Sequence, residues 1–453
     1  MTRVLIVGAG PAGIRAAETL VKAGLRPVIV DEAARAGGQI YRRPPEGFRR
    51  TARTLYGSEA AKAEHLHATF DALVTAGQVE HLPEHSVFAL RNGVAHATGP
   101  NGLLRLPYDR LILSTGATDR VVPVPGWQSA GVYTLGAAQI ALKAQGMALG
   151  RRIVLAGSGP LLTLVAAQLV KAGAGVAAVL DTSSYSDQMW GAAGMAAARP
   201  WVTLRGLRMR AGLGRLYHAG VRLERIETDA NGPVALHWQD ARGRWHETPC
   251  DAVAMGWHLR AETQLADLAG ARFQWSADWA QWLPQTDALG RAGPELYLAG
   301  DGVRILGADG AERAGTLAAH AVLEDLGQPA SGTAALLRRA ARLDRFARAM
   351  ARAFPWPGAQ VRALPDATVL CRCEGITAGE LRGTVPMAGA EANRVKSLAR
   401  VGMGRCQGRY CQLAAAELIA GQAGCAVAQV GRLRGQPPVR PVPIAALLDA
   451  PEG

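Results

Sequence analysis

Four cysteines near the end of the chain are the residues with the clearest capacity for chemistry. Cys371 and Cys373 lie in the stretch CRCEG, and Cys406 and Cys411 lie in GMGRCQGRYC, whereas the first 370 residues contain only Cys250. Clustered thiols in an otherwise cysteine-poor chain indicate metal or redox chemistry rather than a disulfide framework. The spacing differs from the paired C-x2-C knuckles of a zinc ribbon. The pattern predicts a metal or redox site and leaves iron, zinc and four unbound thiols open.

A helix is expected directly after the first cysteine pair. Thr377 and Glu380 have the spacing of a capping box, which starts a helix. The two pairs and this helix start resemble the bacterioferritin-associated-ferredoxin-like domain, a small mainly helical fold that holds a 2Fe–2S cluster by four thiolates. That resemblance implies that the ligands are Cys371, Cys373, Cys406 and Cys411. It also implies that the anionic sulfurs are stabilised by Arg372, Arg405 and Arg409.

The first 32 residues have the pattern of a dinucleotide site. A buried strand over 4–7 leads into a glycine turn with the spacing G-x-G-x-x-G, followed by a helix and a second strand. The glycines allow a tight turn, close approach of a pyrophosphate and close helix–strand packing. An acid at the end of the second strand can bond a ribose hydroxyl. The candidate residues are Gly8, Gly10, Pro11, Ala12, Gly13, Asp31 and Glu32.

Two later segments favour FAD as the ligand of this first site. YDRLILSTGATDR (108–120) is a strand that runs into Thr115 and Gly116, and PELYLAGDGVR (294–304) is a strand that runs into Gly300 and Asp301. Both segments resemble the signatures of the two-dinucleotide flavoproteins, the glutathione- and thioredoxin-reductase-like fold. The resemblance implies that Asp301 contacts the ribityl-pyrophosphate part of FAD. It also implies that the loop AGGQI, with Gly38 and Gln39, lies beside the flavin.

A second nucleotide unit is nested inside the first. Residues 151–181 repeat the strand, turn, helix and strand, but Leu162 stands where the third glycine of the fingerprint would be. No basic cluster for a 2′-phosphate follows Asp181. We therefore expect this unit to keep the fold while its NAD(P) site is vestigial or binds another nucleotide. No redox cysteine pair accompanies the flavin segments, and Cys250 is expected to be a small buried hydrophobe.

These patterns predict an α/β chain with two nested Rossmann-like domains and a small, mainly helical C-terminal 2Fe–2S domain. The predicted parts are a split FAD-binding domain (1–118 and 259–330), an NAD(P)-binding-like domain (119–258), a helical linker (331–365) and the cluster domain (366–453). The linker has Leu343, Phe346 and Met350 at helical spacing opposite an arginine face. It is expected to pack on the flavin domain, with a partner-binding helix as the alternative.

Composition limits the class of protein. The net charge is +13, and residues 331–453 alone carry 17 Lys and Arg against 8 Asp and Glu. We see no interleaving of aromatic and basic residues or groove-reading motif of the kind that indicates nucleic-acid binding, so we expect solvated helix faces and no nucleic-acid partner. No apolar run reaches the ~18 residues that a membrane span requires, and the apolar part of the N-terminus is too short for a secretory signal. The expected location is the cytoplasm, with peripheral association at the inner membrane as the alternative.

The order of domains resembles one group of enzymes over nearly the whole chain. This group contains the α (FAD and iron–sulfur) subunits of heteromeric dehydrogenases: D-hydroxyproline dehydrogenase, opine (octopine, nopaline) dehydrogenase, dye-linked L-proline dehydrogenase and the hydrogen cyanide synthase B subunit. GMGRCQGRYC is the most specific match. The resemblance implies that a D-amino-acid-oxidase-like FAD β subunit oxidises an amino or imino acid, so that no catalytic residue lies on this chain.

In that arrangement this chain would carry electrons towards an acceptor, a quinone or a dye. A small ferredoxin-like γ subunit is a further candidate partner. Two alternatives belong to other classes. One is a free-standing NAD(P)H-dependent flavin and iron–sulfur reductase, and the other is a non-catalytic scaffold with a structural nucleotide.

Overall fold

The first sheet is built around the N-terminal strand. The computed structural model describes residues 2–45, 47–48 and 50–448. β1 (Val4–Val7) is buried throughout, and α1 (Pro11–Lys22) begins behind Gly10. Six strands lie in the order β20, β21, β7, β1, β2, β3, and all but β20 run parallel. The other strands are β2 (Val28–Val30), β3 (Glu80–Leu82), β7 (Arg110–Leu113), β20 (Arg291–Gly293) and β21 (Leu296–Leu298).

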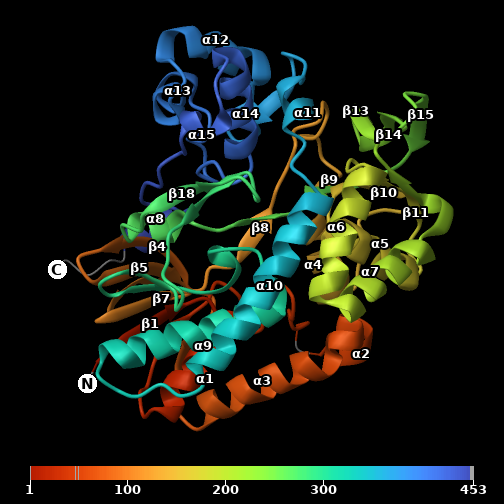
Figure 1. The fold of residues 1–453 in the computed structure, drawn as a ribbon. Coiled ribbons are helices and arrows are strands. Elements are labelled where there is room, and N and C mark those ends of the chain that lie inside the picture. The colour runs from red at the N-terminus through yellow and green to blue at the C-terminus, as the bar shows by residue number, and fades with distance from the viewer. Residues whose placement is uncertain (1, 46, 49, 449–453) are drawn as a thin grey trace.

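Three helices cover one face of this sheet. α3 (Ala60–Thr75) and α9 (Gly307–Asp325) lie beside α1 (Figure 1). α9 approaches α1 so closely that a Cβ at Gly315 would lie 1.9 Å from the carbonyl oxygen of Ala12, which only glycine avoids. The other face carries an antiparallel sheet of β4 (Ser86–Arg91), β5 (Val94–Gly99) and β6 (Gly102–Pro107). The strands β7 and β21 bring their carboxyl ends to the same edge as the glycine turn after β1.

The second parallel sheet belongs to the inserted unit. Its order is β12, β11, β10, β16, β9. The strands are β9 (Val132–Thr134), β10 (Ile153–Ser158), β11 (Val176–Asp181), β12 (Tyr217–Ala219) and β16 (Ala252–Trp257). The main helices are α4 (Leu135–Ile140), α5 (Pro160–Lys171), α6 (Tyr185–Ala198) and α7 (Pro200–Gly212). An antiparallel sheet of β13 (Arg222–Asp229), β14 (Gly232–Gln239) and β15 (Trp245–Pro249) extends from it.

The chain enters and leaves the inserted unit through one pair of antiparallel strands. These are β8 (Ala117–Asp119) and β17 (Leu259–Ala261), in which Thr118 faces Arg260. After β17 the chain forms α8 (Gln264–Leu268) and the hairpin of β18 (Phe273–Ser276) and β19 (Gln281–Pro284). It then returns to the first sheet through β20 and β21. The predicted α/β class with two nested Rossmann-like units is thus confirmed.

The long helix α10 (Thr333–Ala353) runs diagonally between the two units (Figure 1). It lies against α6 as well as α9. The contact with α6 is so close that a Cβ at Gly191 would lie 2.3 Å from the side chain of Ala353. Leu343 and Phe346 are buried as the periodicity predicts. The helix therefore packs on both nucleotide units and not on the flavin unit alone.

The C-terminal part is small and mainly helical, as predicted; its residues 366–430 lie at the top of Figure 1, while residues 444–448 pack beside β6. α11 (Gly358–Arg362) leads to the short strands β22 (Val369–Cys371) and β23 (Ile376–Thr377). The helices α12 (Ala378–Ala388), α13 (Ala392–Ala399), α14 (Gln412–Ala423) and α15 (Val427–Val430) follow, with α16 (Ile444–Leu448) after them. The capping box of Thr377 and Glu380 is confirmed, with both reciprocal hydrogen bonds formed.

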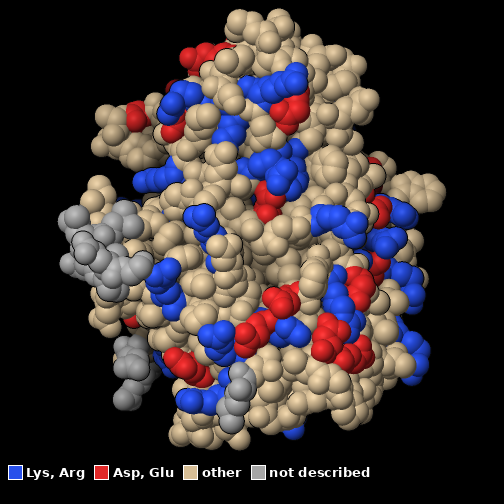
Figure 2. All heavy atoms as spheres, turned by 90° about the vertical axis from the view of Figure 1, so that its left-hand side faces the viewer, with Lys and Arg blue, Asp and Glu red and all other residues tan. Residues whose placement is uncertain are grey.

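The positive charge is dispersed over the face drawn in Figure 2. On that face Lys and Arg side chains alternate with Asp and Glu rather than forming one uniform patch. The view agrees with the interpretation of the charge as solvated helix faces. Across residues 2–45, 47–48 and 50–448, no helix has both the length and the apolar character needed to cross a bilayer.

Candidate functional site

The glycine turn after β1 has the geometry that a dinucleotide requires. A Cβ at Gly13 would lie 1.9 Å from the Gly8 carbonyl oxygen, and one at Gly8 (φ 107°) would lie 2.4 Å from the Ser114 carbonyl oxygen. Both positions are therefore closed to any larger residue. Gly10 differs, because a Cβ there would meet nothing nearer than Gly38 Cα at 3.8 Å. The open space lies at the N-terminus of α1, where backbone N–H groups favour an anion.

The two acids after β2 have different environments. Asp31 is mostly buried and accepts hydrogen bonds from the backbone N–H of Ala9 (2.5 Å) and of Ala33 (2.7 Å). Burial raises the pKa of Asp31 despite these bonds. Glu32 is exposed, and Arg440 Nε contacts its Oε2 at 3.2 Å. Both residues follow the strand, which ends at Val30, so Glu32 does not close the strand as the sequence suggested.

The segments after β7 and β21 converge beside this turn. Thr115 Oγ1 donates to the Glu262 carbonyl oxygen at 2.6 Å, and the N–H of Glu262 donates to the Gly116 carbonyl oxygen. A Cβ at Gly302 would meet Thr115 Oγ1 at 2.8 Å, and one at Gly300 would meet Ala12 Cβ at 3.0 Å. The two strand ends and the first helix thus meet within contact distance.

Asp301 is a partly buried carboxyl at this junction. Its Oδ1 accepts hydrogen bonds from the N–H groups of Leu306 (2.8 Å) and Gly307 (3.1 Å) at the start of α9. Burial raises its pKa to about 6. Oδ2 accepts no hydrogen bond from any described residue. The side chain is therefore held by one oxygen, while the other is available to a ligand hydroxyl.

The loop AGGQI closes over the glycine turn. Gly37 N–H donates to the Ala9 carbonyl oxygen, and a Cβ at Gly38 (φ 62°) would lie 3.0 Å from Gly10 Cα. Gln39 accepts a hydrogen bond from Arg42. A further polar group, Lys143, reaches this loop from the inserted unit and donates to the Ile40 carbonyl oxygen at 3.2 Å. Burial lowers the pKa of Lys143 to about 8. No local sequence signal marks this lysine.

These features fit FAD. An anion-favouring helix start has open space at Gly10, and Gly116 (φ 71°) has no atom within 4 Å of a Cβ position. The partly buried carboxyl of Asp301 has one oxygen free of protein donors among the described residues, and its neighbours Gly300 and Gly302 contact Ala12 and Thr115. The structure brings together the predicted residues Gly8, Gly10, Pro11, Ala12, Gly13, Asp31, Gly38, Thr115, Gly116, Gly300 and Asp301, while Glu32 and Gln39 lie at the rim.

The corresponding acid of the inserted unit is already occupied. Asp181 is fully buried and accepts hydrogen bonds from Ser183 N–H and Oγ, and from the hydroxyl of Tyr217 at 2.5 Å. Gln188 Nε2 lies 3.4 Å away. Leu162, at the position of the third glycine, is fully buried in the core of this unit. Both carboxylate oxygens thus bind protein donors, and little of Asp181 remains for a ribose.

The four predicted thiols converge in the C-terminal unit as two neighbouring pairs. Cys371 and Cys411 hydrogen-bond to each other, and so do Cys373 and Cys406. The hydrogen bond from Cys411, with those from nearby backbone N–H groups, lowers the pKa of Cys371 to about 6. The bond to Cys371, with burial, raises the pKa of Cys411. Among the described residues, no group of three or more His, Cys, Asp or Glu side chains is arranged so that it could hold a metal ion.

Glycines let the cysteine loops approach one another. A Cβ at Gly404 would lie 2.2 Å from Cys373 Cβ, and one at Gly402 would lie 3.5 Å from Gly408 Cα. Four thiols gathered in this way supply the donor set of a 2Fe–2S cluster, in which each iron is held by two thiolates. The residues present therefore fit a 2Fe–2S cluster.

Two cations that the sequence did not single out lie beside the thiols. Arg260 of β17 is buried, and its pKa is lowered by burial while Glu262, Cys411 and Cys406 act against that shift. The buried Lys396 of α13 is likewise close to Cys411. Arg372 instead stacks over the Trp127 ring at 5.5 Å.

Arg409 fixes the cysteine loop to the flavin unit. Its Nε donates to Glu262 Oε2 at 2.6 Å, and both side chains are almost entirely buried. Nη1 donates to the Cys406 carbonyl oxygen and Nη2 to that of Val439. Arg260 Nη1 donates to the Arg409 carbonyl oxygen at 2.7 Å. Since Glu262 also bonds Thr115 and Gly116 through its backbone, one residue touches both candidate sites.

Cys250 needs no functional role. It is 5 % exposed in the core of the inserted unit, and burial raises its pKa to about 11. A thiol of this kind is unreactive at neutral pH. The prediction of a small buried hydrophobe is confirmed.

Comparisons with known proteins agree with this architecture. Residues 2–321 match the pyridine nucleotide-disulphide oxidoreductase family, and residues 371–450 match the sarcosine oxidase A3 domain. The A subunit of opine oxidase from Rhizobium meliloti is 35% identical over 99% of this chain and 87% of that protein. The HcnB subunit of hydrogen cyanide synthase from Pseudomonas aeruginosa is 29% identical over 98% of both chains.

The structural comparison extends to the C-terminal unit. L-proline dehydrogenase from P. horikoshii matches with a TM-score of 0.72 and 17% identity, over 98% of this chain and 80% of that one. Thioredoxin reductase of Lactococcus lactis matches with a TM-score of 0.51 and 15% identity, over 72% of this chain and 99% of that one. At these identities the likeness concerns the fold. The family match and the opine oxidase relatives show that the chain belongs to the pyridine nucleotide-disulphide oxidoreductase family of flavin-dependent oxidoreductases, in the group that contains the A subunits of opine oxidases.

Proposed function

We propose that this chain is the electron-transferring subunit of a heteromeric flavoenzyme that oxidises an amino or imino acid at its C–N bond. In this proposal it binds FAD at the first nucleotide site and one 2Fe–2S cluster at Cys371, Cys373, Cys406 and Cys411. A D-amino-acid-oxidase-like partner oxidises a substrate of the D-hydroxyproline, proline or opine type. A glycine-oxidising complex of the hydrogen cyanide synthase type is the alternative.

The observation that carries the proposal is the position of Glu262 between the two candidate sites. Its side chain binds Arg409 of the cysteine loop, and its backbone binds Thr115 and Gly116 of the flavin segment. A flavin exchanges two electrons or one, whereas an iron–sulfur cluster exchanges one at a time. Arg409 and Glu262 hold the two sites in a fixed relation, and Arg260 provides positive charge beside the thiols.

The residues of the first site divide the work of holding FAD. Gly8, Gly10 and Gly13 admit the pyrophosphate to the N-terminus of α1, and Asp301 offers Oδ2 to a ribityl hydroxyl. Asp31 positions the turn through Ala9, which leaves the exposed Glu32 to contact a ribose. None of these residues removes a proton from substrate, so substrate oxidation belongs to the partner.

The occupied carboxylate of Asp181 argues against the free-standing NAD(P)H reductase. A nicotinamide dinucleotide in the inserted unit would have to displace Ser183 and Tyr217 from this buried group. Breaking such buried hydrogen bonds to a charged group costs about 1.5–3 kcal/mol each. We therefore infer that electrons enter from a protein partner and not from NAD(P)H.

Metal analysis of the purified full-length chain tests the cluster. Two irons and two acid-labile sulfides per chain are expected, together with visible absorbance. Cys373→Ser should lose these signals and destabilise the C-terminal unit, because ligand binding and folding are coupled. Cys425→Ser is the matched control, since Cys425 is a half-buried thiol of the same unit outside the two pairs. A single zinc without visible absorbance would refute the iron–sulfur assignment.

Co-purification from the native host tests the partner. The expected companion is a flavoprotein whose flavin is reduced by an amino or imino acid. Isolation of this chain alone, with an activity driven by NADH, would replace the proposal by the reductase alternative.

A further inference from the structure

After α15 the chain crosses back from the C-terminal unit to the flavin unit. We call residues 432–440 the strap. Arg432 donates to both oxygens of Asp267 at 2.6 and 2.7 Å, and the N–H of Gly435 donates to the same carboxylate at 2.6 Å. The Asp267 side chain is almost entirely buried. The strap is therefore attached firmly at its start to α8, the helix that follows β17.

The far end of the strap is inserted into the flavin unit. Val439 is 1 % exposed and lies in the core that also holds Val7 of β1 and Leu113 of β7. Its N–H donates to the Phe88 carbonyl oxygen of β4 at 2.9 Å, and its carbonyl oxygen accepts a hydrogen bond from Arg409 Nη2 at 3.0 Å. Both backbone groups and the side chain of Val439 are thus held, which fixes the direction in which the next residue leaves.

The next residue, Arg440, reaches the acid proposed for the ribose. Its Nε donates to Glu32 Oε2 at 3.2 Å, and its Nη1 lies 3.9 Å from Glu262 Oε2. The Glu32 side chain is 58% exposed. Ion pairs that are open to solvent contribute little to stability, so this contact is not what holds the strap in place. Its consequence is for Glu32.

Glu32 keeps one oxygen for a ligand. Its Oε1 accepts no hydrogen bond from any described residue. A carboxylate has roughly four lone-pair sites, so it can bind an arginine and a ribose hydroxyl at the same time. Without Arg440 the exposed Glu32 side chain would rotate freely, and its negative charge would oppose that of a pyrophosphate. The arginine restricts the rotation and offsets the charge.

We propose that Arg440 is a positioning residue of the first nucleotide site, where it holds Glu32 in place for the adenosine ribose of FAD. The inference rests on the FAD site proposed above. Through the strap, the C-terminal unit thus takes part in binding the flavin as well as supplying the thiols. Holding one side chain that otherwise rotates should tighten FAD binding about two- to tenfold.

The FAD affinity of the full chain, freed of its flavin, tests this role. Quenching of FAD fluorescence gives Kd. Arg440→Met should raise Kd about two- to tenfold, and Arg440→Lys, which keeps a cation, should stay within about twofold of the wild type. ADP, which lacks the flavin half, should lose affinity by the same factor when it competes with FAD, because Glu32 acts at the ribose. An ADP affinity that Arg440→Met leaves unchanged would overturn the proposal.

A double variant shows whether Arg440 acts through Glu32. Glu32→Ala removes the acceptor and should itself weaken FAD binding, and adding Arg440→Met should then change Kd by less than about twofold. Full additivity would mean that Arg440 acts elsewhere. Amide exchange of the strap in Arg440→Met should match the wild type, because Val439 and Arg432 hold the strap. Faster exchange there would make Arg440 an anchor of the strap and overturn its role at Glu32.

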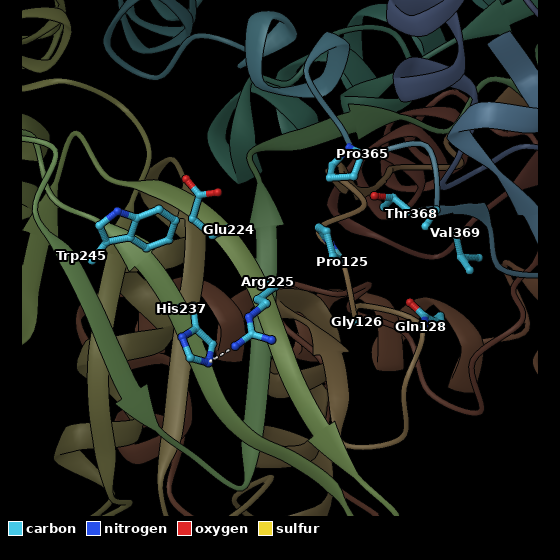
Figure 3. A pocket seen from close by; sticks show the side chains of 11 residues that line it. Pro125, Gly126, Gln128, Glu224, Arg225, His237, Trp245, Pro365, Thr368 and Val369 are labelled. Atoms are coloured by element: carbon cyan, nitrogen blue, oxygen red, sulfur yellow. Dashed lines mark hydrogen bonds between the residues drawn. The ribbon is translucent and has the colours of Figure 1, made fainter.

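Two other arginines are controls for the loss of a positive charge. Arg434 belongs to the same strap, its side chain is 65% exposed, and its partner carboxylate keeps Arg432. Arg225 lies away from the strap, where it contacts His237 on the wall of a cavity of about 560 Å³ between β13–β15 and the segment that leads into β22 (Figure 3). Arg434→Met and Arg225→Met should leave Kd for FAD unchanged. A loss in either control equal to that in Arg440→Met would assign the effect to overall charge and refute the proposal.

Failure of the inference and failure of the proposed function give different results. A wild-type chain that binds no FAD would refute the FAD site and this inference with it. A wild-type chain that binds FAD, with the same Kd in Arg440→Met, would refute only the role of Arg440.

Discussion

Replacing Arg409 by methionine should loosen the cysteine loop from the flavin unit. The change keeps an unbranched apolar stem but leaves Glu262 buried without its closest cation. It also leaves the carbonyl oxygens of Cys406 and Val439 without their donors. Breaking a buried pair by removing one partner costs about 3–5 kcal/mol. Arg440 Nη1 lies 3.9 Å from Glu262 Oε2 and would still compensate part of its charge, so we expect a cost nearer about 3 than about 5 kcal/mol.

Amide hydrogen exchange measures this effect locally. A loss of about 3–5 kcal/mol corresponds to a roughly 100- to 4000-fold increase in the opening of the segment 404–411. The matched control is Arg400→Met, in the same unit, because Arg400 is 63% exposed and its pair with Glu374 lies at the surface. An exposed pair contributes about 0–1 kcal/mol, so the control should change little.

The double variant separates lost attraction from buried charge. With Glu262→Gln added to Arg409→Met, no uncompensated carboxylate remains, and exchange should slow again by about tenfold or more relative to the single variant. If Arg409→Met exchanged no faster than Arg400→Met, the reasoning that this pair joins the two units would be wrong. A double variant that opened further than the single one would also contradict it.

Three other predictions concern the nucleotide sites. Gly10→Asp should fold, because the nearest atom to a Cβ at this position is 3.8 Å away. The variant should lose its flavin, because the new carboxylate occupies the pyrophosphate position. A variant that stays yellow at full flavin occupancy would contradict the assignment of the first site. Rapid-mixing experiments should show no flavin reduction by micromolar NADH or NADPH in the isolated chain, and bleaching within the turnover time would overturn our interpretation of the inserted unit. For Asp301 the folded pKa of about 6 lies above the ordinary 3.8, so the flavin-free fold loses stability as pH rises through that interval. Asp301→Asn should therefore stabilise the flavin-free chain at pH 7 by about 3 kcal/mol in urea unfolding, with the gain vanishing near pH 4; an equal gain at both pH values would point to packing instead.

Features that depend on neighbouring residues were predictable from the sequence. The glycine turn, the buried strand before it and the capping box of Thr377 and Glu380 each occupy a few consecutive positions. Their conformations follow from local sterics and local hydrogen bonds, which any chain with those residues must satisfy. The nesting of the two units also followed, because the strand–turn–helix pattern recurs in the sequence.

The end of the second strand was less well predicted. Asp31 and Glu32 are adjacent acids, and the spacing alone allows either to reach a ribose. In the structure Asp31 accepts a hydrogen bond from the N–H of Ala9, whereas Glu32 contacts Arg440, which is distant in sequence. A choice between adjacent residues depends on which side of the chain is buried, and a strand end gives no periodicity from which to read that.

The charge environment of the thiols could not be predicted, because it is supplied by another part of the chain. The arginines next to the cysteines in sequence were the natural candidates for stabilising the thiolates. In the structure Arg372 stacks on Trp127 and Arg409 forms an ion pair with Glu262. Arg260 is a buried cation that contacts the cysteine loop, and it belongs to the strand by which the chain leaves the inserted unit. An arginine in GWHLRAET carries no local mark of this role. Only the pairing of β8 with β17, and the docking of the C-terminal unit on it, places its charge there. Since the same strand leads into Glu262, the contacts that neutralise the thiols and those that shape the flavin segment depend on one stretch of backbone. A substitution that shifts β17 should therefore disturb both candidate sites together.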